Sequence, residues 1–341
     1  MPKRTLHVLY QSDDNYAMVS GISITSLLEN NRHLKRIVIH YCGYRVKKVN
    51  RLRLTKIVSS YPNAFIEFID AEPYHRELTG LGVKAWHGVY VTWFKLLAFG
   101  DVKVRDSDRL LFINGHTIIC GQLDGIIDLD LGDNLMALSY DALINSHKRV
   151  IGFSPGDKYY NCGIMLINLK KWQKNKESEK IRASLAERSD YMIADQDFCN
   201  LFYKNKIKTL GVEYNFSSAY YSYNLRIFLK FNGLQGGHFY SYDELMSNYY
   251  SPKIIHSLYG VQGKPWESGN MHPQRFLWKK YKALTPWRSV RTSEAKRTIA
   301  WSLFNTMPQW AFLCIYWVMV SRKFGTLQLS RNKLINPRSN P

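Results

Sequence analysis

The chain has 341 residues, of which 45% are hydrophobic, and a formal net charge of +20 at pH 7. This is enough for one large core, or for one core with a smaller appendage. The five cysteines form no CxxC pair, which argues against a disulfide framework or a structural zinc site and fits a reducing compartment. The positive charge predicts an anionic partner: a nucleotide diphosphate, an anionic membrane surface or nucleic acid.

The first part of the chain alternates predicted strands with predicted helices, a pattern that indicates right-handed βαβ units and a parallel sheet. The amino terminus lacks the long apolar core of a signal peptide, so we expect a cytoplasmic protein. In chain order the predicted elements are a strand at 6–10, a helix at 19–28, a strand at 37–41, a helix at 49–57 and a strand at 65–69.

The loop Asp13-Asp14-Asn15 follows the first predicted strand and is expected at the carboxyl edge of the sheet, where ligands bind in such folds. Neither GxGxxG nor GxxxxGK[ST] occurs, so this loop does not hold phosphate in the dinucleotide or P-loop manner. Its carboxylates can accept hydrogen bonds from a base or ribose. They can equally cap the helix that follows.

A helix is predicted between Val91 and Phe99, with Lys95 inside a mostly apolar face. A lysine in this position either extends its amine to solvent or meets a bound anion. The next predicted element, Leu110–Ile113, is apolar on both faces and is typical of a buried central strand. It ends at Asn114-Gly115-His116, where Gly115 allows close approach of a ligand and its neighbours carry polar atoms. The alternative is a β-turn with a satisfied histidine. A turn-rich stretch, 123–132, leads to a strand at 135–138.

Another buried strand is predicted after Tyr160, with Asn161 and Gly163 at its entrance, where an amide and a small residue suit close packing on a sugar or phosphate. Asp195-Gln196-Asp197 then opens a helix, and its carboxylates either cap that helix or bind sugar hydroxyls beside a reacting carbon. His256 ends a short predicted strand and Lys264 follows eight residues later. Together these two side chains can hold a metal-bridged diphosphate.

These motifs, in this order from about Leu6 to Trp287, resemble glycosyltransferase family 8, and most of all its bacterial lipopolysaccharide core galactosyl- and glucosyltransferases. The resemblance implies an α/β fold of the GT-A (Rossmann-like) type: a mixed, mostly parallel sheet flanked by helices, here with a basic helical extension at the carboxyl end. It also implies that Asp195 and Gln196 act on the donor sugar next to the anomeric carbon. The donor-binding positions that it implies are Asp13 on uracil, Asn15 on ribose, Lys95 on the sugar-nucleotide, Asn161 and Gly163 in the sugar pocket, and Lys264 on the diphosphate.

The sequence departs from the family at its centre. Where the family has Asp-x-Asp, with two carboxylates that hold Mn²⁺ or Mg²⁺ against the diphosphate, this chain has Asn114-Gly115-His116. The implied metal ligands are Asn114, His116 and His256, a weaker set that tolerates Mn²⁺ or another divalent cation. The interval from His256 to Lys264 is also two residues longer than is usual in the family. An altered-metal enzyme, a metal-independent one and an inactive member all remain open.

The carboxyl-terminal segment, 271–341, holds 13 basic residues and one acidic residue, and so accounts for most of the excess charge. Within it lies the apolar, aromatic stretch Trp310–Val320, shorter than the roughly 20 residues that span a bilayer. Aromatic anchors beside cations are typical of a helix at the surface of an anionic membrane. The alternative is a core helix packed on the rest of the protein. Nucleic acid is disfavoured, because no recognised binding module accompanies the charge.

We therefore expect a nucleotide-sugar-dependent catalytic domain at 1–270 and a membrane-association segment at 271–341, peripheral on the inner face of the cytoplasmic membrane. The expected activity is transfer of glucose or galactose from a UDP-sugar, with retention at the anomeric carbon, to lipopolysaccharide, lipo-oligosaccharide or another lipid-linked glycan. His87 and the region 220–246 are expected near the acceptor. The alternative is a catalytically impaired member that binds a glycan or a partner protein.

Overall fold

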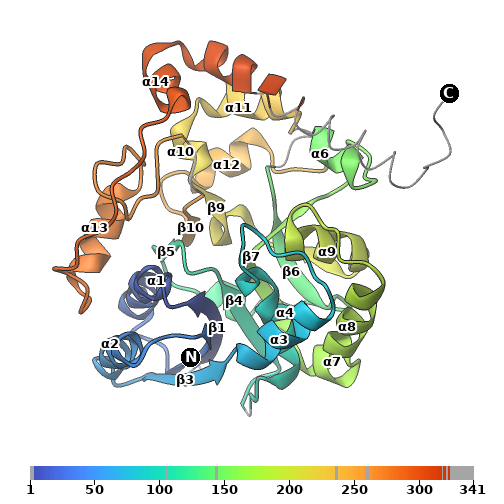
Figure 1. The fold of residues 1–341 in the computed structure, drawn as a ribbon, viewed down its shortest axis with the longest axis vertical. Coiled ribbons are helices and arrows are strands. Elements are labelled where there is room, and N and C mark those ends of the chain that lie inside the picture. The colour runs from blue at the N-terminus through green and yellow to red at the C-terminus, as the bar shows by residue number, and fades with distance from the viewer. Residues whose placement is uncertain are drawn as a thin grey trace.

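The computed structural model describes residues 4–104, 106–142, 145–234, 237–258, 261–316, 318–319 and 322 (Figure 1). Its centre is a seven-stranded sheet in the order β3-β2-β1-β4-β7-β6-β8. In chain order the strands of this sheet are β1 (Thr5–Asp13), β2 (Arg36–Tyr44), β3 (Ala64–Asp70), β4 (Arg109–Ile113), β6 (Met136–Tyr140), β7 (Tyr160–Asn168) and β8 (Ile207–Thr209).

The direction of β7 decides which residues share an edge of the sheet. β1, β2, β3 and β4 pair in parallel, and so do β6 and β8, whereas β7 runs antiparallel to both of its neighbours, β4 and β6. The first residues of β7 therefore lie at the same edge as the last residues of β1, β4 and β6. This direction brings the predicted sugar-pocket residues to the edge where ligands are expected.

Helices cover both faces of the sheet, as the edge-on view in Figure 1 shows. Strand residues alternate between two cores, so that Phe112 points to one core while Leu111 and Ile113 point to the other. On the face of Leu111 lie α1 (Ala17–Asn30), α2 (Lys48–Ser59) and α5 (Asp124–Ile127). On the face of Phe112 lie α3 (Glu72–Gly80), α4 (Val91–Asp101), α7 (Leu169–Lys174), α8 (Glu177–Glu187) and α9 (Ala194–Phe202).

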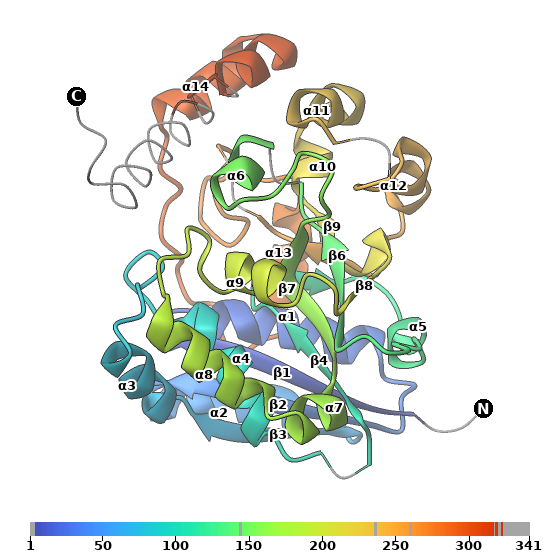
Figure 2. The ribbon, with the colours of Figure 1, turned by 90° about the vertical axis from the view of Figure 1, so that its right-hand side faces the viewer.

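A smaller layer lies beyond the carboxyl edge of the large sheet (Figure 2). It contains a three-stranded sheet in the order β5-β10-β9 and a separate aromatic core around Phe216 and Tyr220. Its elements are β5 (Thr117–Ile119), β9 (Phe216–Ser217), β10 (Ile254–His256), α6 (Asn145–Val150), a 3₁₀ turn (Val212–Tyr214), α10 (Ala219–Ser222), α11 (Leu225–Asn232) and α12 (Tyr242–Asn248). The predicted site residues therefore lie between the large, mostly parallel sheet and this layer.

The carboxyl-terminal helices differ in how they pack. α13 (Arg275–Ala283) lies on α1, where Tyr281 OH accepts a hydrogen bond of 2.8 Å from Asn30 Nδ2. After it, Trp287 is buried against α1; a Cβ added at Gly21 would lie 2.4 Å from its ring. α14 (Ile299–Thr306) is followed by a helical stretch, 309–316, whose Phe312 and Leu313 are buried. The basic residues of the tail from 323 onward lie outside the described residues.

The structure confirms the expected fold class and the predicted elements, with two differences in detail. β1 continues to Asp13, so that Gln11 and Ser12 belong to the strand and not to the loop, because they pair in register with β2. The stretch 123–132, predicted as turns, contains the short helix α5, whose Ile126 is buried in the core.

Candidate active site

The predicted site residues meet at the carboxyl edge of the large sheet, on loops and termini of elements that are far apart in the sequence. Asp13 ends β1, Asn114 follows β4, Asn161 lies at the start of β7 and His256 ends β10. Asp13 accepts a hydrogen bond of 2.9 Å from the backbone N–H of Tyr16, just before α1. This contact closes the loop before α1 but does not cap the helix, whose N-cap residue is Tyr16, without a side-chain cap hydrogen bond. Asn15 is exposed at the tip of the same loop.

Tyr16 connects this loop to the centre of the site. Its ring packs edge-on against His116 at 6.1 Å and against Trp266 at 5.7 Å, measured between ring centroids. Trp266 in turn packs on Trp278 of α13 at 5.0 Å. The loop after β1, the Asn114-Gly115-His116 turn and the loop that carries Lys264 therefore share one aromatic contact surface, which sequence reasoning did not predict.

Lys95 and Asp195 form a buried ion pair, with 2.5 Å between Nζ and Oδ2. Their side chains are only 3% and 9% exposed. Lys95 Nζ also donates to the Thr92 carbonyl at 3.0 Å and lies over the Phe112 ring. Burial raises the pKa of the Asp195 carboxyl, and Lys95 opposes this rise. Lys95 therefore does not extend its amine to solvent, which was the first of the two alternatives; the anion beside it in this structure is a carboxylate of the protein.

The three members of the Asp195-Gln196-Asp197 motif have different partners at the start of α9. Asp197 performs the capping, since its Oδ2 accepts from the backbone N–H of Ile193 at 2.8 Å. Gln196 Oε1 accepts from the backbone N–H of Cys162 at 3.2 Å, which joins α9 to β7. Asp195 is held by Lys95, so the capping alternative applies to Asp197 and not to Asp195.

Asp141 is a residue of this site that sequence reasoning missed. Its Oδ2 accepts hydrogen bonds from Asn161 Nδ2 at 2.6 Å and from Gln196 Nε2 at 3.1 Å. Burial raises the pKa of the Asp141 carboxyl, and these two hydrogen bonds oppose the rise. The available signal was a carboxylate directly after the predicted strand 135–138, at the edge where the other strands end. Asp141 fixes the orientation of two predicted site residues at once.

A second polar chain starts from the same asparagine. Asn161 Oδ1 accepts from the backbone N–H of Gly163 at 2.8 Å and from Asn215 Nδ2 at 3.0 Å. Asn215 Oδ1 contacts His256 Nδ1 at 3.0 Å, and His256 Nε2 contacts His116 Nε2 at 2.8 Å. The two histidines predicted as metal ligands are thus in direct contact.

Two glycines make room for this arrangement. A Cβ at Gly163 would lie 2.2 Å from His256 Cε1, so the space at this position is filled by an imidazole of the protein. A Cβ at Gly115 would lie 2.4 Å from Ser20 Oγ of α1. Gly115 therefore allows close packing of the Asn114-Gly115-His116 turn on a helix. The backbone of Gly163 thus lies against the His256 ring, and the turn that carries His116 is packed closely on α1.

The donor atoms at the centre do not fit a hard divalent cation. Within the part of the chain that the structure describes, no three His, Cys, Asp or Glu side chains gather as a metal-holding group. The predicted set offers two imidazoles and an amide, whereas Mn²⁺ and Mg²⁺ prefer several oxygen ligands, carboxylates above all. Among the described residues, the expected metal site therefore lacks its anionic ligands.

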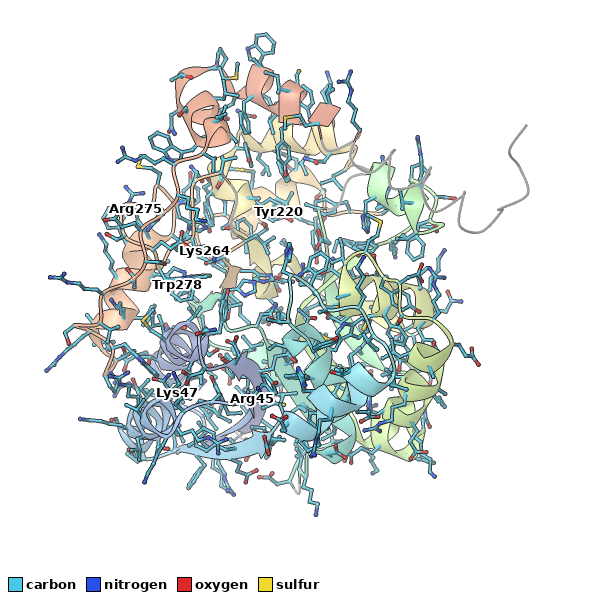
Figure 3. The ribbon with its side chains drawn as sticks, viewed as in Figure 1. Arg45, Lys47, Tyr220, Lys264, Arg275 and Trp278 are labelled. Atoms are coloured by element: carbon cyan, nitrogen blue, oxygen red, sulfur yellow. The ribbon has the colours of Figure 1, made fainter. Side chains whose placement is uncertain are left out.

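Lys264 lies on the loop that follows β10, beside α13 (Figure 3). Its Nζ is 3.8 Å from Glu267 Oε1, and its side chain is 39% exposed. The loop is paired with a later segment: Ser268 N donates to the Ser293 carbonyl at 2.8 Å, and Ala295 N donates to the Ser268 carbonyl at 2.9 Å. The lysine predicted to bind the diphosphate is thus carried by a loop tied to the carboxyl-terminal segment.

Comparison with known proteins agrees with this geometry. The model of the family described as "Glycosyl transferase family 8" matches residues 7–269. "Lipopolysaccharide 1,2-glucosyltransferase" of Escherichia coli is 26% identical over 306 residues, which cover 86% of this chain and 82% of that protein. "General stress protein A" of Bacillus subtilis is 24% identical over 84% of this chain and 96% of its own length. The crystal structure of the galactosyltransferase LgtC with donor and acceptor sugar analogues superposes with a TM-score of 0.67 at 20% identity, covering 83% of this chain and 99% of LgtC.

Proposed function

The chain belongs to glycosyl transferase family 8, and from this premise we propose that it transfers glucose or galactose from a UDP-sugar to a lipopolysaccharide-type glycan with retention at the anomeric carbon. It is a glycosyltransferase of the GT-A fold. One observation carries the proposal: Lys95 of α4, Asp195 and Gln196 of α9 and Asn161 of β7 lie together at the carboxyl edge of the sheet, where Lys95 pairs with Asp195 and Asp141 joins Gln196 to Asn161. Lipopolysaccharide glucosyl- and galactosyltransferases among its relatives support the acceptor class.

The cluster suits the electrostatic demands of glycosyl transfer. The protein has to stabilise a departing diphosphate and a sugar with positive charge at its anomeric carbon, and fixed dipoles and charges do this best. In the proposal Asp195 binds hydroxyls of the donor sugar, and Gln196 directs its amide oxygen toward the anomeric carbon. Asp141 and the Cys162 N–H hold that amide in place, and Asn161 in turn holds the Asp141 carboxylate.

The proposed course is front-side attack by an acceptor hydroxyl on the face from which the diphosphate leaves, which gives retention. The bond from the anomeric carbon to the acceptor oxygen replaces the bond to the diphosphate, and the departing phosphate oxygen takes the hydroxyl proton. Asp195 is neutralised by Lys95, and Asp141 accepts two hydrogen bonds through one oxygen, so both carboxylates serve as fixed polar groups. Gln196 is uncharged and a poor covalent nucleophile. In the proposal, catalysis is therefore mainly positioning and charge stabilisation.

His87 is proposed to lie near the acceptor. It sits at the exposed tip of a turn closed by backbone hydrogen bonds of 2.9 and 3.0 Å between Trp86 and Val89. Within the predicted acceptor region 220–246, the helices α10, α11 and α12 belong to the smaller layer. A turn on one side and an aromatic layer on the other are suitable walls for a glycan.

Residues 271–341 are proposed to attach the protein to the inner face of the cytoplasmic membrane, with α13 as the anchor on the catalytic domain. Beyond Trp287 the helical segments expose apolar side chains: Ile299 is 82% exposed and Trp310 is 58% exposed. Apolar side chains beside basic ones favour the surface of an anionic bilayer. In the described residues, no helix has both the length and the apolar character needed to cross a bilayer.

The test is UDP release from a panel of UDP-sugars by the purified chain, with and without a lipopolysaccharide core acceptor. We expect release from UDP-glucose or UDP-galactose, and an NMR spectrum of the product with the donor's anomeric configuration. Asp195→Asn is expected to remove this release. The matched control is Asp190→Asn, because Asp190 is an exposed carboxylate that pairs with Arg188, two residues earlier in the chain. Glycan binding without release of UDP from any donor would favour the impaired member instead.

A further inference from the structure

In the pair His116–His256, the lone pair of one ring is occupied by a hydrogen bond from the other ring. Asn215 Nδ2 donates to Asn161, so Asn215 Oδ1 faces His256 and accepts the proton of His256 Nδ1. In a neutral ring the remaining nitrogen, His256 Nε2, is then an acceptor. It accepts from His116 Nε2, which is 2.8 Å away. The lone pair of His256 Nε2 therefore points at a hydrogen of His116 and not at a place that a cation can occupy.

The charges around the pair are those of an anion site. The cations that act electrostatically on the rings are Lys264 and Lys95 for His116, and Lys95 for His256. A site that attracts a divalent cation has the opposite surroundings, because carboxylates neutralise the ion.

The packing keeps the pair in this state. The ring of His256 lies against the backbone of Gly163, where no Cβ fits, and Gly115 holds the neighbouring turn on Ser20. Breaking the contact between the two rings to admit a cation would require movement of these packed elements. Lys264, on the other hand, is 39% exposed and has the reach of a long side chain.

We propose that this transferase binds the diphosphate of its donor without a divalent cation, with the Lys264 ammonium as the charged contact and the hydrogen-bonded His116–His256 pair as the uncharged wall of the site. The ligand class is a nucleoside diphosphate or a nucleoside diphosphate sugar. The inference rests on the proposed function, since it takes a UDP-sugar as the donor. In this arrangement Lys264 leaves Glu267 and contacts the anion, a charge-assisted contact that also favours the departing UDP.

The experiment is calorimetric titration of the full chain with UDP, once in excess EDTA and once in excess Mn²⁺. We expect the same Kd in both buffers to within about twofold, and Mn²⁺ alone to give no heat and no change in its EPR spectrum. Lys264→Ala is expected to weaken UDP binding by about tenfold or more in EDTA, as the loss of one charge-assisted contact predicts. The control is Lys170→Ala, an exposed lysine beside Asp108 that is outside the proposed site, for which the Kd should not change.

The outcomes separate this inference from the proposed function. UDP binding that requires Mn²⁺ overturns the metal-free site and leaves the proposed transfer standing. An unchanged Kd for Lys264→Ala overturns the assignment of the charged contact. UDP binding in neither buffer overturns the nucleotide donor, and with it both proposals.

Discussion

Removal of the Asp195 carboxylate is expected to affect stability and turnover separately. In Asp195→Ala the Lys95 ammonium, which is 3% exposed in the native protein, loses its charged partner and keeps the Thr92 carbonyl as a hydrogen-bond acceptor. Breaking a buried pair by removing one member costs about 3–5 kcal/mol of unfolding free energy. Loss of a helix cap would cost only about 1 kcal/mol. Since Asp197 does the capping at α9, the larger figure applies.

The assay is a double-mutant cycle with urea unfolding as the readout. Asp195→Ala and Lys95→Met are measured alone and together, because the double variant no longer buries an unpaired charge. We expect the double variant to be more stable than Asp195→Ala alone. UDP release is then measured on Asp195→Asn, which keeps the size of the side chain and a hydrogen-bond acceptor for Lys95.

Two results would refute this reasoning. If Asp195→Ala unfolds at the wild-type urea concentration, the buried pair is not a stabilising contact of the folded protein. If a well-folded Asp195→Asn variant keeps wild-type turnover, Asp195 supports the fold only and has no part in transfer. A variant that is inactive because it is unfolded is recognised by its unfolding curve and decides neither point.

Further predictions concern the centre, the tail and the pH dependence. Asn114→Asp combined with His116→Asp should create Mn²⁺ binding that calorimetry detects; no gain in Mn²⁺ affinity would show that carboxylates are not what the site lacks. Ending the chain at Arg297 should abolish sedimentation with anionic vesicles, and binding of the full chain should fall as salt increases; sedimentation unaffected by either change would remove the membrane proposal. The unfolding free energy should fall as pH drops from about 6.5 toward 4, because burial lowers the pKa of His40, His116 and His272 to about 4 and the unfolded chain takes up these protons first. In urea titrations at several pH values His272→Gln should flatten this fall, and an identical pH profile in the variant would contradict the assignment. Buried carboxyls such as Asp141 act in the opposite direction, so the comparison uses the difference between variant and wild type.

The sequence was sufficient for the elements and for the edge at which the site lies, because both follow from local patterns. Leu110–Ile113 is apolar on both faces and is a central strand, and the histidine that follows Ile254 and Ile255 is the end of β10. Residue-by-residue resemblance to a family then predicted that Asp195 and Gln196 lie near Asn161, and in the structure Asp141 joins Gln196 to Asn161.

What the sequence did not predict depends on partners that are distant in the chain. Lys95 and Asp195 are 100 residues apart, and only the packing of α4 beside α9 brings them together. The same holds for Asp141 with Gln196, and for Asn215 with His256. Local periodicity says which face a side chain takes, but not which neighbour it meets. Local periodicity therefore does not predict whether a lysine extends to solvent, contacts a ligand or pairs with a carboxylate.

The pairing of Ser268 with residues 293–295 connects the Lys264 loop directly to the carboxyl-terminal segment. Along the chain, Trp287 is fixed in the core, the two backbone hydrogen bonds to Ser268 come next, and α14 follows. In a protein held through α14, a pull on that helix would reach these hydrogen bonds before it reached Trp287. Each bond has a net value of only about 1 kcal/mol, so the pairing gives way first. A force that pulls the protein off the membrane would thus loosen the Lys264 loop. To measure donor binding without membrane attachment, a shortened protein should end at Arg297 and not at Trp287, so that the hydrogen bonds between Ser268 and residues 293–295 are kept.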